Sequence, residues 1–143
     1  MQQLLGEYGG RVRVVVKFAP YPYREYARVA ARAALAAGEQ GHFAEMHELL
    51  LRNYRLLNAK TIPALAASLG LDGDRFRADL DSERLVQRVE QDVALTRSLN
   101  IYQTPTFVIG PTGRPGRVLV GERPIEHLRK AVDEELAALG GGR

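Results

Sequence analysis

The sequence contains no cysteine and no tryptophan, and only three histidines. Without cysteine, these residues supply no disulfide, no thiolate metal ligand and no sulfur nucleophile. No apolar run approaches the ~20 residues that span a bilayer, and the opening MQQLLGEYGG lacks the basic segment and apolar core of a signal peptide. We therefore expect no membrane partner. The compartment stays open, with the cytoplasm expected if Met1 is the true start.

The charged residues are nearly balanced, since 20 Lys and Arg face 17 Asp and Glu for a net charge of +3. Arginines alternate with acidic residues in stretches such as DGDRFRADLDSERLVQRVEQD, a pattern typical of solvated helix faces with i,i+4 ion pairs. Nucleic-acid binding needs a one-sided basic stripe, which this pattern does not provide. We expect no nucleic-acid partner, and a globular chain long enough to bury one core.

The predicted elements follow the order half-helix, strand, helical block, hairpin and helix. Residues 2–8 end at a Gly-Gly pair, as helices often do, and RVRVVVKF (11–18) alternates and then runs apolar, which predicts a largely buried strand. Helical patterns follow at 23–37, from Gln40 or His42 to about 54, at 61–69, within 71–82, and at 82–99. Short strands at 106–110 and 117–121 and a helix from 124 to 139 complete the chain. This order predicts an α/β fold with a helical insertion and a thin sheet.

One motif and its setting resemble a known family. TPTFVIG (104–110), followed by a short hairpin and a last helix, stands at the same order and spacing as in the DsbA-like thiol-disulfide oxidoreductases of the thioredoxin superfamily. The resemblance extends over essentially the whole chain, including YGGRVRVVVKFAPYP and LAASLGLDGDRFRADLDS. It implies a thioredoxin-like part, residues 1–22 and 100–143, and an inserted helical domain, residues 23–99, in an N-terminally truncated form of the fold.

The resemblance also implies a substrate-binding loop. In this family a Thr-Pro step with a cis peptide bond opens the third strand, and the backbone before the proline pairs with an extended peptide or protein substrate. Thr104 and Pro105 stand at that step; by spacing alone, a trans proline that merely starts a strand is the alternative. The aromatic residues of FAPYPYREY are interpreted either as a cap on the core or as the aromatic wall of a peptide groove, with Tyr21 and Tyr23 as candidate substrate contacts. They are Phe18, Tyr21, Tyr23 and Tyr26.

The family's catalytic Cys-X-X-Cys has no counterpart here. That motif begins the first helix, whereas residues 2–8 resemble the end of that helix, so the preceding strand and the motif would lie upstream. Because the thiolate is the nucleophile of disulfide exchange, we expect a redox-inactive chain with no catalytic residue and no cofactor. Two alternatives stay open: a non-catalytic peptide-binding module, and a glutathione-binding relative of the kappa-class transferase or isomerase type with its site upstream.

His42 and His47 lie near Glu45 and Glu48 and suggest a metal site at first sight. The histidines are five residues apart, which does not stack them on one helix face, and the order His-Glu-x-x-His is absent. We expect no metal.

The lost strand has a consequence for assembly. In the complete fold it lies between the strands equivalent to 11–18 and 106–110, and open strand edges are prone to association. We expect a homodimer, or a swapped arrangement, with the contact near residues 1–16. Direct pairing of 11–18 with 106–110 inside one monomer is the alternative.

Overall fold

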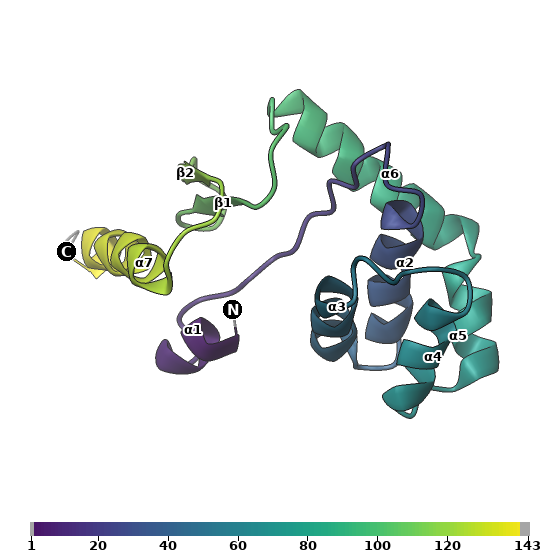
Figure 1. The fold of residues 1–143 in the computed structure, drawn as a ribbon. Coiled ribbons are helices and arrows are strands. Elements are labelled where there is room, and N and C mark those ends of the chain that lie inside the picture. The colour runs from purple at the N-terminus through teal and green to yellow at the C-terminus, as the bar shows by residue number, and fades with distance from the viewer. Residues whose placement is uncertain (1, 141–143) are drawn as a thin grey trace. The chain divides into compact units, whose positions relative to one another are not determined.

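The computed structural model describes residues 2–140, which form seven helices and two strands (Figure 1). The elements are α1 (Gln2–Glu7), α2 (Ala27–Gly38), α3 (Phe43–Arg52), α4 (Thr61–Ser68), α5 (Gly73–Leu80), α6 (Glu83–Ser98), β1 (Thr106–Ile109), β2 (Arg117–Val120) and α7 (Ile125–Gly140). They belong to two compact units, one within Met1–Val16 and Leu99–Arg143 and the other Lys17–Ser98. The α/β fold with a thin sheet is confirmed. Within the described range, no helix is long and apolar enough to cross a bilayer.

The helical unit, residues 17–98, is built around α2. This helix contacts α3, α4, α5 and α6, and four of its alanines are completely buried (Ala33, Ala34, Ala36, Ala37). Alanine favours the helix, and its small side chain lets neighbouring helices approach closely. Larger side chains from those helices fill the remaining core: Met46, Leu50, Ile62, Phe76, Leu80 and Leu85.

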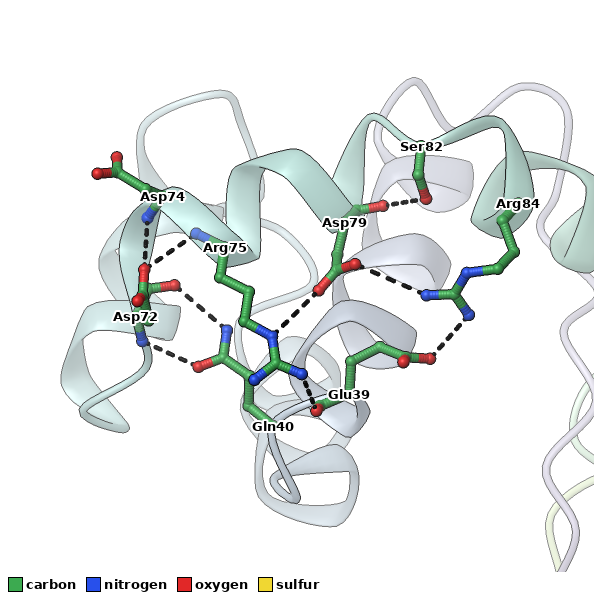
Figure 2. A network of polar contacts seen from close by, with 8 residues as sticks. All are labelled: Glu39, Gln40, Asp72, Asp74, Arg75, Asp79, Ser82 and Arg84. Carbon is green, nitrogen blue, oxygen red and sulfur yellow. Dashed lines mark hydrogen bonds and ion pairs between the residues drawn. The ribbon is translucent and has the colours of Figure 1, made fainter.

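Polar contacts join the end of α2 to α5 and α6, as Figure 2 shows. The Gln40 side chain accepts a hydrogen bond from the Asp72 N–H at 2.9 Å and donates to the Asp72 carbonyl at 3.2 Å. Arg75 donates to the Glu39 carbonyl at 2.8 Å, and Arg84 donates to the Glu39 carboxylate at 2.9 Å. These bonds give hydrogen-bond partners to backbone groups near the helix ends, which lack partners within their own helix.

The second unit is organised by a hairpin and α7. β1 and β2 pair antiparallel, with Thr106 opposite Val120 and Ile109 opposite Arg117. The inward face of this pair packs with side chains of α1, α7 and the segment after α1, namely Phe107, Ile109, Leu119, Leu4, Tyr8, Val12, Leu128 and Val132. The other face leaves Val108, Val118 and Val120 exposed.

The predicted buried strand at 11–18 is wrong. The segment is not a strand, and none of its residues is buried; Val15 is 57% exposed, while Val12, Val14 and Val16 are half-buried. Within the described residues, the sheet has only β1 and β2, so direct pairing of 11–18 with 106–110 does not occur either. The valines favour an extended backbone, but a strand needs a neighbour for its main-chain hydrogen bonds, and this segment has none in the described chain.

Candidate functional site

The Thr104–Pro105 loop connects α6 to β1. The Thr104–Pro105 peptide bond is cis, the conformation that the family resemblance implies, and both residues are exposed. Two hydrogen bonds hold the backbone on either side of Thr104. The Thr106 hydroxyl donates to the Gln103 carbonyl at 2.6 Å, and the Gly121 N–H donates to the Pro105 carbonyl at 2.8 Å.

Gly121 lets the end of β2 reach this loop. Its φ of +86° lies in the left-handed region that glycine adopts without steric cost. A Cβ at this position would also stand 3.5 Å from Nε2 of Gln103. The loop is therefore fixed to the hairpin by local backbone geometry, and the sequence analysis missed this role of Gly121.

Tyr102 adds an aromatic ring to the loop that the sequence analysis did not single out. Its side chain is 73% exposed, and its hydroxyl donates to Oδ1 of Asn100 at 3.0 Å. Asn100 ends the turn after α6 with a φ of +55°, a conformation that asparagine tolerates better than most residues. The signal in the sequence was the tyrosine two residues before Thr104.

Tyr21 and Tyr23 stack on one another in the segment before α2. Their ring centroids are 5.3 Å apart with an interplanar angle of 22°, and the Arg24 guanidinium lies 5.8 Å from the Tyr23 centroid. Tyr23 is 73% exposed, whereas Phe18 and Tyr26 pack against the helical core. The two interpretations thus separate by residue: Phe18 and Tyr26 cover the core, and Tyr23 presents its ring to solvent.

The two pairs of predicted site residues lie in different compact units. Thr104 and Pro105 belong to the hairpin unit, and Tyr21 and Tyr23 belong to the helical unit. Each pair is therefore a surface of its own unit.

A buried carboxylate that the sequence analysis missed lies on α6. Asp92 is 2% exposed; its Oδ1 accepts from Nζ of Lys17 at 2.8 Å and its Oδ2 accepts from the Phe18 N–H at 3.2 Å. Both oxygens accept a hydrogen bond, so this buried carboxylate serves as an anchor for the segment at Lys17 and Phe18. Its partners are about 75 residues away in the sequence, which is why no local pattern signals it.

His47, one of the two histidines considered for a metal site, packs among aromatic rings. His47 stacks on Phe43, with centroids 5.7 Å apart, and meets Phe18 edge to face at 6.3 Å. Burial among these rings lowers the pKa of His47. No group of three histidine, aspartate or glutamate residues suited to a metal ion occurs in residues 2–140.

Comparison with known proteins gives one family and relatives that include sodium/proton antiporters. The model of the family described as DSBA-like thioredoxin domain matches residues 1–133. The Na(+)/H(+) antiporter NhaA 3 of Salinispora tropica is 38% identical over 139 residues, which is 96% of this chain and 20% of that protein. The Na(+)/H(+) antiporter NhaA 1 of Salinispora arenicola is 41% identical over 112 residues, 78% of this chain and 16% of that protein. The chain thus spans a fifth or less of the length of these two relatives.

Among solved structures, the fold is similar to that of ScsC from Proteus mirabilis in a compact conformation. The TM-score is 0.73 at 23% sequence identity, and the match covers 97% of this chain and 76% of that one.

Proposed function

Because the chain belongs to the DSBA-like thioredoxin domain family and supplies no cysteine, we propose that it binds polypeptides without catalysing disulfide exchange. The observation that carries this proposal is the exposed loop at Thr104–Pro105 beside an open edge of β1. Disulfide exchange needs a thiolate nucleophile, and these 143 residues contain none.

The proposed mode of binding is strand addition at β1. Within the described chain β1 pairs only with β2, so one edge of β1 presents backbone N–H and C=O groups that an extended peptide can engage. Val108, Val118 and Val120 form an exposed apolar face on the hairpin. A strand added beside β1 would continue that face, which favours a substrate with apolar side chains at alternate positions.

Aromatic side chains supply further proposed contacts. Tyr102 stands two residues before Thr104 with most of its ring exposed. Tyr21 and Tyr23 form a stacked pair on the helical unit, which we propose as a separate peptide-contacting surface of that unit. Tyrosine provides a large contact area with only two side-chain torsions to fix, which suits a site that accepts many sequences.

The binding test is a nuclear magnetic resonance titration with a synthetic peptide of alternating valine and threonine flanked by lysines. The amide signals of residues 103, 104 and 106–109 should shift, and Tyr102→Ala should weaken binding several-fold. Tyr54→Ala is the matched control, because Tyr54 is also an exposed tyrosine but lies outside the proposed site. Equal affinity in the two variants, or shifts confined to other residues, would contradict the proposal.

The redox test is separate. Insulin reduction and dithiol oxidation by this polypeptide should remain at the blank rate. Turnover that persists through chromatography would contradict the non-catalytic assignment while leaving peptide binding to be judged by its own titration.

A homodimer is the assembly that we propose. The open edge of β1 and the three exposed valines give a second copy both main-chain groups and apolar area to cover. Light scattering should show a dimer at tens of micromolar, and a monodisperse mass near 15.8 kDa would contradict it. If dimer and peptide share β1, adding the peptide should dissociate the dimer.

The antiporter relatives favour a second candidate function. The match covers nearly all of this chain in the Salinispora tropica protein, and none of the described helices can cross a bilayer. We therefore propose that the chain can act as an extramembrane module whose partner is a sodium/proton antiporter. Antiport in proteoliposomes should change when the purified chain is added to an antiporter that lacks its own such region; unchanged antiport, together with failure to co-purify, would contradict this candidate.

A further inference from the structure

A surface cavity of about 320 Å³, open to solvent, lies between β2 and α7 in the hairpin unit. Arg117 and Leu119 come from β2, Arg123 from the connection, and His127, Lys130, Ala131 and Glu134 from α7. On the helix these residues fall at spacings of three and four, so they share one face. On the strand the two residues alternate, so they too share a face.

The charges around this cavity are unbalanced. Arg117 is paired with Glu134 at 2.5 Å, whereas neither Arg123 nor Lys130 forms an ion pair with any described residue. Glu122 and Glu126 are neighbours in the sequence but do not line the cavity. Among the residues that line the cavity, three cations face one carboxylate, so two positive charges have no ion-pair partner within the lining. His127 adds a further hydrogen-bonding group.

The floor of the cavity is apolar. Leu119 is half-buried against the hairpin core and Ala131 is buried. A cavity of this size lies at the lower end of the range for small-molecule sites, which combine an apolar lining with a few polar groups that fix orientation. The arrangement suits a ligand with an anionic head and a small apolar body.

We propose that this cavity binds a phosphate monoester. A phosphate dianion matches the two uncompensated charges, and guanidinium groups bind phosphate oxygens with paired, charge-assisted hydrogen bonds. Arg123 and Lys130 contact the phosphate, Arg117 stays oriented by Glu134, and the organic group lies over Leu119 and Ala131. This inference concerns a different surface from the open edge of β1 and stands independently of the proposed function.

The test uses phenyl phosphate in a titration followed by nuclear magnetic resonance of the complete chain. Binding should be saturable with a dissociation constant on the order of 0.1–1 mM, and the shifted amides should include those of residues 117–119 and 127–131. Arg123→Gln and Lys130→Gln should each weaken binding by about ten- to hundredfold, because each removes a charge-assisted hydrogen bond. Arg114→Gln is the matched control, since Arg114 is an exposed arginine of the hairpin turn that does not line the cavity, and it should leave the affinity unchanged.

Two further ligands separate the contributions. Phenyl sulfate has the same shape with a single negative charge and should bind more weakly; inorganic phosphate lacks the apolar body and should also bind more weakly. Equal affinity for phenyl phosphate and phenyl sulfate, or equal affinity of wild type and Arg123→Gln for phenyl phosphate, would overturn the proposal.

The source of the phosphate monoester is distinguished with vesicles. Phosphatidic acid in phosphatidylcholine vesicles carries the same headgroup chemistry as a free metabolite. Co-sedimentation that Arg123→Gln abolishes supports the site and assigns a lipid as its ligand. Binding of phenyl phosphate without co-sedimentation supports the site and assigns a soluble ligand.

Discussion

The Lys17 ammonium lies 2.8 Å from a carboxylate oxygen of Asp92, a residue 75 positions further along the chain. The second oxygen of Asp92 accepts from the N–H of Phe18. The buried carboxylate therefore fixes both a side chain and the backbone at the point where the helical unit begins.

Replacing this carboxylate should destabilise the protein. Asp92→Asn keeps the shape of the side chain but removes the charge, so the hydrogen bonds from Lys17 and Phe18 weaken. We expect a loss of roughly 1–3 kcal/mol in the free energy of unfolding, measured by urea denaturation. Glu90→Gln is the control, because Glu90 forms an exposed pair with Arg28 at 2.7 Å and such pairs contribute less than about 1 kcal/mol. A larger loss in the control would contradict the anchoring role.

His47 should make stability depend on pH in a defined direction. Burial lowers the pKa of His47 in the folded protein below the ordinary value of about 6.5. The unfolded chain then binds the proton more tightly than the folded chain. The free energy of unfolding is therefore highest above pH about 6.5 and falls as the pH drops through the folded-state pKa. His47→Phe keeps an aromatic ring and removes the titration. Urea denaturation from neutral to mildly acidic pH should show a flatter dependence in this variant, and identical curves would contradict the prediction.

Tyr8 should be protected from ionisation. Burial, followed by the hydrogen bond to Asp133 at 2.8 Å and the charge of that carboxylate, raises the pKa of Tyr8. Its contribution to stability is present below pH about 10 and is lost as pH rises through the raised folded-state pKa. An ultraviolet absorbance titration of the tyrosines should therefore end with a late step that Tyr8→Phe removes. A late step that persists in the variant would assign it to another tyrosine.

Two glycine substitutions should act in opposite directions. A Cβ on Gly116 would lie 2.8 Å from the carbonyl oxygen of Ile109, so Gly116→Ala forces the hairpin backbone apart and should cost more than about 1 kcal/mol. Gly6 lies in α1, and a Cβ there meets nothing within 4 Å, so Gly6→Ala should stabilise by about 0.5–1 kcal/mol. Thermal unfolding of both variants checks the pair, and a neutral Gly116→Ala would contradict the close approach.

The helices were predictable because their signals are local. Thr61 and Gly70 predicted a helix near 61–69, and Ser82 followed by Glu83 predicted one near 82–99; the structure has α4 and α6 there. α2 begins at Ala27, later than the predicted 23, because Tyr21 and Arg24 close a turn through a backbone hydrogen bond of 3.1 Å. The hairpin was also predictable from two short apolar runs around a proline- and glycine-rich turn.

Features that depend on distant partners were not predictable. The valines of 11–18 have a strand pattern, but a strand forms only where another strand pairs with it. Arg117 and Lys130 line one cavity only because the connection through Arg123 brings α7 against the hairpin. The Thr104–Pro105 loop was found through resemblance, whereas the role of Gly121 depends on its hydrogen bond to Pro105, which the sequence does not reveal.

The buried alanines of α2 restrict how this protein can change by mutation. Ala33, Ala34, Ala36 and Ala37 are completely enclosed, so there is no room for an added methyl or carboxyl group without displacing a neighbouring helix. Single-nucleotide changes of an alanine codon give valine, threonine, serine, proline, aspartate, glutamate or glycine. All but glycine add atoms, and glycine weakens a helix by about 1 kcal/mol. Almost every single-nucleotide substitution at these four codons is therefore expected to destabilise the protein. Homologous chains with a larger residue at one of these positions should carry a smaller residue at the facing position of a neighbouring helix.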